Sequence, residues 1–201
     1  MKVGLILECG PQGADKAVCE YLANLLNPEI EIVSLTLDNK PGLIENCAEA
    51  TQSLLELDHC DRVVIIWDLY PAWRKAGERP SCIQDRAQIL EKLDAAGINI
   101  PNVFLVCIVE ELEAWLLSEH QAISAVLSRP HRAVRIRREQ RPERVRNPKA
   151  RLIKYFEENV GKPYDDRVHA KQIVQNIANT NRLRRCRTFV RFALKVAGIE
   201  L

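Results

Sequence analysis

Acidic side chains follow three of the apolar segments of the sequence, at the positions where each segment ends. Glu8 follows LIL, Asp68 follows VVIIW, and the pair Glu110 and Glu111 follows VFLVCIV. Carboxylates that are brought together repel one another unless a cation offsets their charge, and Mg²⁺ prefers oxygen ligands. Glu8, Asp68 and Glu111 are therefore candidate catalytic residues and candidate ligands of Mg²⁺ or Mn²⁺, each able to act as an acid or base beside the metal.

Each of these acids has a simpler explanation when it is taken alone. Acidic residues are favoured at helix N-caps and in the first turn of a helix, where the helix dipole stabilises their charge. The segment EELEAWLLS at 110–118 begins with acids in this way. The simple explanation is the better one for any single residue, but three acids at one sheet edge make a shared site an equally good explanation.

A sheet would bring these acids together, because the segments that precede them have the composition of buried strands. Apolar runs alternate along the chain with segments of helical period, which is typical of an α/β protein with a four-stranded, mainly parallel sheet and helices on both faces. The carboxyl ends of parallel strands meet at one edge, about 5–10 Å apart, where ligands of such folds bind. The expected strands are 3–7, 29–37, 62–67 and 103–109, and the expected helices are 15–26, 43–57, 82–96, 110–118, 148–159, 166–178 and 183–197.

The charge of the chain is divided unequally along its length, although the net charge is only +2. Residues 1–128 contain 9 Lys and Arg against 20 Asp and Glu, whereas residues 129–201 contain 20 against 7. We therefore predict an α/β domain over 1–128 that tolerates clustered carboxylates, and a basic loop with a helical extension over 129–201 that is packed on it and faces a polyanion. Alternatively, the two parts neutralise each other across an internal interface.

The basic segment 129–154 is the candidate nucleic-acid interface. It holds eleven Lys and Arg against two Glu and contains three prolines, which indicates an extended loop rather than a regular helix. Arginine suits bidentate contact with phosphates, and such contacts give a salt-dependent affinity with little sequence preference. A solvated loop, or an arm that docks an acidic protein, would have the same composition. The candidate phosphate-binding residues are Arg135, Arg137, Arg138, Arg141, Arg144, Arg146 and Arg185.

Several short motifs, in order along nearly the whole chain, carry a resemblance to known proteins. A strand that ends in Glu, followed two units later by a strand that ends in Asp, resembles the Toprim fold of topoisomerases, primases and OLD-type nucleases. More closely, the chain is similar to a bacterial family known only as a domain of unknown function and related to the RloB-like Toprim proteins. The motifs are LILECG at 5–10, VVIIWD at 63–68, VEELEAWLLS at 109–118, NPKA at 147–150, KPYDDRVHAKQI at 162–173 and RCRTFVRF at 185–192.

The resemblance implies a metal-dependent phosphodiester chemistry, with Glu8 as acid/base or ligand and Asp68 as a ligand of Mg²⁺. The Toprim pattern has a second Asp two residues after the first, where this chain has Tyr70. A phenol does not replace a carboxylate as a ligand at neutral pH, so either Glu111 or Glu113 supplies the charge or the site only binds. The family-like E-x-E spacing keeps Glu113 as a further metal ligand.

The segment around His169 matches the family-like pattern Tyr-x-Lys-x-x-His only loosely, because Asp166 and Arg167 stand where a Lys is expected. Lys171, as a catalytic residue, and Arg185 would approach the carboxylates and position a phosphate. Surface charges on an amphipathic helix are the alternative explanation for both.

Composition excludes several other classes of protein. The chain has 201 residues, 47% of them hydrophobic, which is enough for a folded core. Its seven cysteines show no C-x-x-C pair and its four histidines no metal spacing, which disfavours a disulfide framework and a zinc or iron enzyme. Among them, Cys9, Cys19, Cys47 and Cys107 are expected to be small core residues. No apolar run is long enough for a signal peptide or a membrane span, so a cytoplasmic protein is expected.

Three functions remain open from the sequence. The first is a Mg²⁺-dependent nuclease or nucleic-acid-processing protein, as one component of an anti-phage defence system. The second is a non-catalytic nucleic-acid-binding or adaptor module that is partnered with an ATPase, which Tyr70 favours. The third is a small-molecule or nucleotide enzyme, although the glycines at 10 and 13 are too sparse for a phosphate-binding loop.

Overall fold

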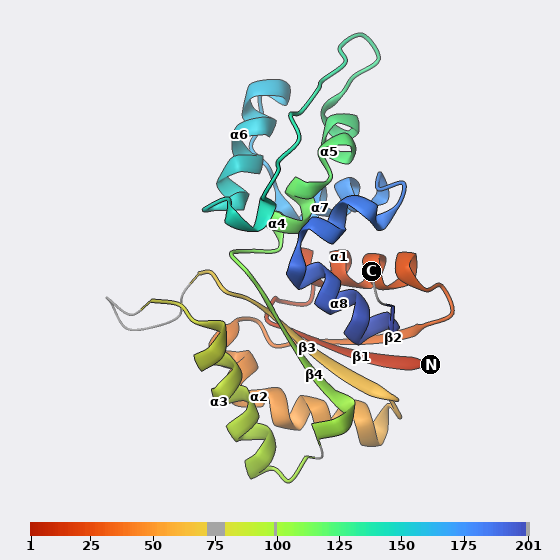
Figure 1. Ribbon diagram of the computed structural model, residues 1–201, viewed down its shortest axis with the longest axis vertical. Coiled ribbons are helices and arrows are strands. Elements are labelled where there is room, and N and C mark those ends of the chain that lie inside the picture. Colours follow the sequence, from red (N-terminus) through yellow and green to blue (C-terminus); the bar gives the residue numbers. More distant parts are fainter. Residues whose placement is uncertain (72–78, 99, 200–201) are drawn as a thin grey trace.

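The sheet has four strands, all of them parallel, as the alternating sequence pattern predicts. The computed structural model describes residues 1–71, 79–98 and 100–199. The order of the strands across the sheet is β2-β1-β3-β4 (Figure 1). Their bounds are β1 Lys2–Leu7, β2 Glu31–Thr36, β3 Arg62–Asp68 and β4 Val103–Ile108.

The register of the strands brings the acidic ends together. Leu7 pairs with Ile66, and Asp68 pairs with Ile108. Glu8 therefore leaves β1 beside the end of β3, and the 109–113 segment leaves β4 beside Asp68. This confirms the expectation that these strands end at one edge of the sheet.

Helices cover both faces of the sheet, because alternate side chains of each strand point to opposite faces. Leu5 and Leu7 of β1 pack into one apolar cluster and Ile6 into the other. Helices α2 (Lys40–Gln52) and α3 (Cys82–Ala95) cover the face of Ile6, and α1 (Ala14–Leu26) and α8 (Arg187–Ala197) cover the opposite face (Figure 1). The fold is therefore an α/β, Rossmann-like one.

The remaining helices stand beyond the carboxyl edge of the sheet, on the side of α1 (Figure 1). They are α4 (Glu113–Ser118), α5 (His120–Leu127), α6 (Pro148–Val160) and α7 (Asp166–Gln175). Trp115 of α4 is fully buried and packs edge-on against Phe189, with ring centroids 5.5 Å apart. One apolar cluster contains residues of both 1–128 and 129–201, so the basic part of the chain shares its core with the α/β part.

Several helices differ from the sequence-based expectation: α5 has no counterpart in it, α2 begins at Lys40 and not at 43, and α7 ends at Gln175 and not at 178. The helix after β4 begins at Glu113 and not at Glu110, because Glu110 adopts the left-handed conformation with φ 66°. A π-helical turn, Ser53–Leu57, follows α2 in place of regular helix. The last predicted helix is divided into a 3₁₀ segment, Thr180–Arg185, and α8. Between Ser128 and Asn147 the helical structure is one 3₁₀ turn, Pro142–Arg144, as the prolines predict.

One cysteine prediction is wrong. Cys107 was expected to be a free core residue, but it forms a disulfide with Cys82, with 5.8 Å between the Cα atoms. The sequence separation of 25 residues hides this pair, because β4 and the start of α3 become neighbours only through the fold. The sequence predicts that Trp67, Trp73 and Trp115 are packing residues; Trp67 and Trp115 are buried, whereas Trp73 lies outside the described residues. Within the described ranges, no helix has the length and apolar character that a membrane span needs.

Candidate functional site

Glu8 and Asp68 lie side by side at the carboxyl edge of the sheet. The Asp68 backbone N–H donates to Glu8 Oε1 at 3.0 Å, and the Leu112 N–H donates to Asp68 Oδ2 at 3.1 Å. The second oxygens, Glu8 Oε2 and Asp68 Oδ1, are buried and have no hydrogen-bond partner within the described part of the chain. Buried carboxylate oxygens that lack a partner are unfavourable unless a cation or proton satisfies them.

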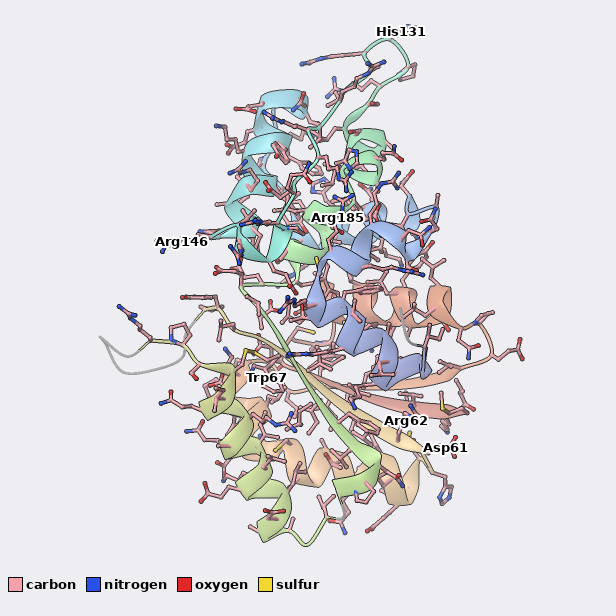
Figure 2. All side chains as sticks on the ribbon, viewed as in Figure 1. Asp61, Arg62, Trp67, His131, Arg146 and Arg185 are labelled. Carbon is pink, nitrogen blue, oxygen red and sulfur yellow. A yellow bond between two sulfur atoms is a disulfide. The ribbon has the colours of Figure 1, made fainter. Side chains whose placement is uncertain are left out.

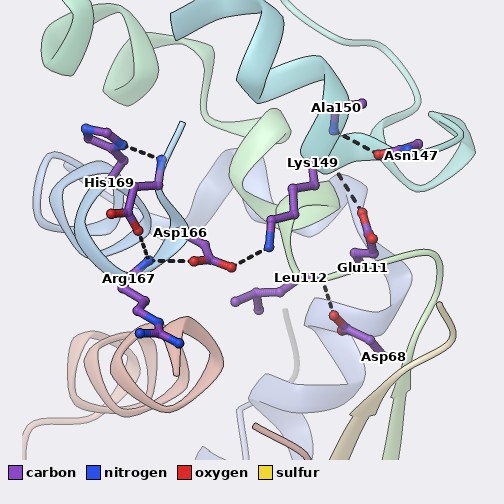
Figure 3. Close-up of polar contacts among 10 residues, drawn as sticks. Asp68, Glu111, Leu112, Asn147, Lys149, Ala150, Asp166, Arg167 and His169 are labelled. Carbon is purple, nitrogen blue, oxygen red and sulfur yellow. Dashed lines mark hydrogen bonds and ion pairs between the residues drawn. The ribbon is translucent and has the colours of Figure 1, made fainter. Parts of the chain in front are cut away.

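These two carboxylates line a cavity of about 310 Å³ between the sheet edge and helices α1, α4, α6 and α7. Its lining is strongly polar, and acids outnumber bases in it. Figure 3 shows Asp68, Glu111, Lys149 and Asp166 around this region. The acids of the lining are Glu8, Asp15, Asp38, Asp68, Glu111, Glu113 and Asp166, and the bases are Lys40, Lys149 and Arg167.

Burial and mutual repulsion raise the proton affinity of the innermost acids. Burial raises the pKa of Glu8 to about 7, although the charge of Lys40 opposes the shift. Burial together with the charge of Asp166 raises the pKa of Asp15 to about 6. The pKa of Asp68 lies well above its ordinary value, because its carboxyl is buried and faces both Asp15 and Glu8. Without a cation, the cluster therefore retains protons near neutral pH.

The structure assigns different surroundings to Glu111 and Glu113. Glu111 Oε2 accepts from the Lys149 backbone N–H at 3.3 Å, at the first turn of α6 (Figure 3). Glu113 is 6% exposed, and burial raises its pKa to about 8. Sequence reasoning preferred Glu111, but its contact matches the alternative explanation of a helix-capping acid. Glu113 is the more deeply buried acid of the cavity.

Two lysines that sequence reasoning did not select balance part of this charge. Lys40 is 3% exposed; its Nζ donates to the Leu69 carbonyl oxygen at 3.0 Å and lies 3.9 Å from Asp85 Oδ2. The Lys149 ammonium donates to the Asp166 carboxylate (Figure 3). Both lysines line the cavity with carboxylates, so the site combines acids with fixed cations.

Lys171 and His169 lie outside the lining of this cavity. Lys171 is exposed on α7, whereas Arg167 and Asp166 of the same helix face the cavity. His169 Nδ1 accepts from the Asp165 N–H at 2.8 Å, and its ring centroid lies 4.3 Å from that of Phe156. The histidine thus has a structural environment, and Lys149 takes the place in the cavity that Lys171 was expected to have.

The predicted arginines are divided among three places. Arg135, Arg137 and Arg138 are exposed on the irregular segment before Pro142. Arg146 lines a second cavity of about 800 Å³ beside Tyr70 and Glu111. The remaining three, Arg141, Arg144 and Arg185, line a third cavity of about 490 Å³. Arg185 is therefore part of a basic site and not of the acidic cavity.

Sequence reasoning also missed Asp15, although its position carries a signal. Asp15 lies in the first turn of α1, where the helix dipole alone explains an acid. The connection from β1 to α1 is short, so the residue that begins the helix returns to the same sheet edge as Glu8. Lys40, three residues after the expected strand 29–37, could have been found by the same reasoning.

The loop between Glu8 and Asp15 depends on a glycine. A Cβ atom on Gly13 would lie 2.4 Å from Cys9 Cβ, whereas a Cβ atom on Gly10 would meet only Asp38 Oδ1 at 3.6 Å. We expect Gly13→Ala to lower the free energy of unfolding by about 1–3 kcal/mol through this overlap, measured by urea unfolding. Gly10→Ala is the matched control in the same loop and should change it by less; equal stabilities of the two variants would contradict the prediction.

The fold and this site together define a Rossmann-like α/β protein with a carboxylate-lined cavity at the carboxyl edge of a parallel sheet. Over residues 11–197, the sequence matches the family described as a domain of unknown function, DUF4276. The chain therefore belongs to this family. Neither the comparison with curated proteins nor the comparison with solved structures found a match.

Proposed function

We propose that the protein is a Toprim-like, Mg²⁺- or Mn²⁺-dependent nuclease or nucleic-acid-processing enzyme. The observation that carries the proposal is the pair of buried, unpartnered oxygens on Glu8 and Asp68, adjacent carboxylates at the ligand-binding edge of the sheet. Two such oxygens, each of which a cation would satisfy, distinguish this arrangement from acids that only cap helices.

The carboxylates of Glu8 and Asp68 fit a magnesium site in which the protein supplies only a few of the ligands. Among the described residues, no three His, Cys, Asp or Glu side chains are arranged so that they could hold a metal ion on their own. Mg²⁺ does not require such a cage, because it commonly keeps several waters and binds one or two carboxylates together with substrate phosphates. We infer that Glu8 and Asp68 are the protein ligands and that Glu113, which lines the same cavity and whose charge acts on Asp68, supports them.

The other residues of the cavity have distinct roles in this proposal. A bound divalent ion would offset phosphate charge and lower the pKa of water. Without the ion, Glu8 has a pKa of about 7, so it holds a proton for part of the time at neutral pH and would release it when the ion binds. Lys149 and Arg167, from the basic part of the chain, line the same cavity and can neutralise a phosphate. The proposed substrate is therefore a nucleic acid that reaches the site from the side of α6 and α7.

A non-catalytic module is the second candidate, and Tyr70 is the observation that favours it. Tyr70 lines the acidic cavity at the position where the Toprim pattern has a second Asp, and it is 37% exposed. A site with two metal ligands and a phenol can retain nucleic-acid binding without turnover. In that case the protein would act as an adaptor, partnered with an ATPase. A role in anti-phage defence is compatible with either candidate.

Titration calorimetry with Mg²⁺ and Mn²⁺ separates these two functions. At pH 8, where most of Glu8 is ionised, we expect the wild type to bind one ion and Asp68→Asn to lose at least tenfold in affinity, since it removes one of two charged ligands. Asp38→Asn, at the rim of the cavity, is the control and should bind nearly as the wild type. A wild type without measurable affinity for either ion would exclude the enzyme and leave the binding module.

A further inference from the structure

Four arginines from two distant segments surround the third cavity, which we call the arginine pocket. Its basic residues are Arg141, Arg144, Arg185 and Arg187, and Val109, Gln140 and Glu143 complete its described lining. Arg185 is half-buried and the other three arginines are exposed. Figure 2 places Arg185 beside the start of α8 and Arg146 apart from it; Arg146 lines the second cavity instead. Sequence reasoning had not selected Arg187.

The two segments are fixed to each other by one carboxylate. Glu143 accepts from the backbone N–H groups of Arg187 at 2.9 Å and Thr188 at 2.8 Å, and from the Thr188 hydroxyl. Arg185 Nη1 donates to the Glu139 carbonyl oxygen at 3.2 Å. The arginines are therefore held around the pocket by contacts of the backbone that carries them, before any ligand binds, which reduces the entropic cost of binding.

The positive charge of the pocket has no matching negative charge in its lining. Glu143 is the single acid of the described lining, and its two oxygens are already engaged by the first turn of α8. Within the described ranges, none of the four arginines forms an ion pair. The neighbouring charges of Arg138 and Arg182 even lower the pKa of Arg185, after the larger effect of burial. Gathered cations of this kind attract an anion with more than one charge.

The arginine pocket adjoins the acidic cavity through the segment that leaves β4. Val109 lines the arginine pocket, whereas Glu111 lines the acidic cavity. The Cα atoms of residues two apart are separated by at most about 8 Å, which corresponds to a rise of about two nucleotides along one strand of a duplex. This short segment is what a single phosphodiester chain would cross to reach both places.

We propose that the arginine pocket binds the phosphodiester backbone of a nucleic acid and directs it across residues 109–113 to the carboxylates. This deepens the proposed function and rests on it for the identity of the ligand. Arginine forks bind phosphate oxygens in two-point contacts that carry no base information. The pocket would accordingly position the nucleic-acid strand without sequence specificity.

The test compares the wild type with the double variant Arg144→Gln/Arg187→Gln. For each protein, the affinity for a short fluorescein-labelled DNA duplex is measured at several salt concentrations. The single DNA strand and an RNA strand serve as further probes. Binding is followed by fluorescence anisotropy in EDTA. If both residues contact phosphates, the slope of log affinity against log salt decreases by about 2 and the affinity at about 0.1 M salt falls by about 60-fold. Arg144→Lys/Arg187→Lys should recover most of the slope.

The control is Arg86→Gln/Lys162→Gln, which removes the same charge from exposed positions on α3 and after α6. Its slope should equal that of the wild type. An Arg144→Gln/Arg187→Gln slope equal to the control's, or a wild type that binds none of the three probes, would overturn the proposal. Because EDTA prevents metal-dependent cleavage, a failure of the enzyme hypothesis at Glu8 and Asp68 leaves the binding result unaffected, and the two failures can be distinguished.

Discussion

Asp68→Asn is expected to reduce Mg²⁺-dependent cleavage of nucleic acid by at least about 10²-fold. The substitution retains the size of the side chain and an oxygen for the Leu112 N–H, but removes the charge that would hold the ion. Glu8→Gln should have a comparable effect, of at least about 10²-fold, because it removes the other of the two charged ligands. Cleavage of labelled DNA and RNA with Mg²⁺ or Mn²⁺ measures both effects.

Asp61→Asn is the matched control for this experiment. Asp61 directly precedes β3, whereas Asp68 ends this strand, and Asp61 is exposed. Figure 2 labels Asp61 near one end of β3 and Trp67 near the other. It accepts from the Lys2 N–H at 2.7 Å. The control should cleave like the wild type. If Asp68→Asn and Glu8→Gln also cleave at the wild-type rate, the catalytic site is elsewhere or the activity belongs to a contaminant, and the proposed site is rejected.

The metal-free protein is expected to lose stability as the pH rises from about 5 to about 8. Burial raises the pKa of Glu8 to about 7 and that of Glu113 to about 8, above the values of the unfolded chain. The folded state therefore binds more protons than the unfolded state in this range, so the free energy of unfolding decreases with pH. The stabilisation is complete below about pH 4.5 and is lost once the pH exceeds the folded pKa values.

The size of this effect follows from the shift at Glu113. At about 1.4 kcal/mol for each tenfold change in proton affinity, this buried acid alone accounts for at most about 5 kcal/mol. Roughly 3–4 kcal/mol of this is lost between pH 5 and pH 8, because the acid is about half ionised at pH 8, and for a chain of this length that corresponds to a decrease in melting temperature of about 6–14 °C. Differential scanning calorimetry in EDTA measures it. Mg²⁺ should restore the melting temperature at pH 8 and have little effect at pH 5, because its ligands must be deprotonated.

Glu113→Gln isolates the contribution of one acid. The amide cannot ionise, so the variant should melt above the wild type at pH 8 and near it at pH 5. Glu45→Gln, an exposed acid on α2 paired with Lys92, is the control. A metal-free melting temperature that is constant or rises between pH 5 and pH 8 would show that the acids of the cavity ionise without penalty, contrary to their burial.

The strands and their common edge could be predicted from sequence because burial on both faces leaves a local signal. VVIIW at 63–67 is apolar throughout, and its last residue is followed directly by Asp68. Parallel pairing then places Glu8 and Asp68 at one edge of the sheet, but the strand order β2-β1-β3-β4, which makes β1 and β3 neighbours, carries no local signal in the sequence. The disagreement over Glu111 and Glu113 arose from a single backbone conformation: the left-handed Glu110 delays the start of α4 and changes which acid is buried.

The rest of the site depends on contacts between segments far apart in sequence. Lys149 lies 141 residues after Glu8 and enters the cavity only because α6 begins against the end of β4. Arg187 joins Arg144 through Glu143, a contact across more than forty positions. No local sequence pattern in either of these segments indicates which distant segment it contacts. Composition indicated a basic half, but not that three of its predicted arginines would gather around one pocket.

The shared core between the acidic and basic parts has a consequence for how the chain can be divided. Trp115 of α4 is enclosed by Phe189 and Phe192 of α8, and its indole N–H donates to Thr188 Oγ1 at 2.8 Å. Removing everything after Ser128 would uncover this ring and at the same time take Lys149 away from the carboxylates. The acidic half therefore depends on the C-terminal residues both to cover Trp115 and to bring Lys149 to the carboxylates.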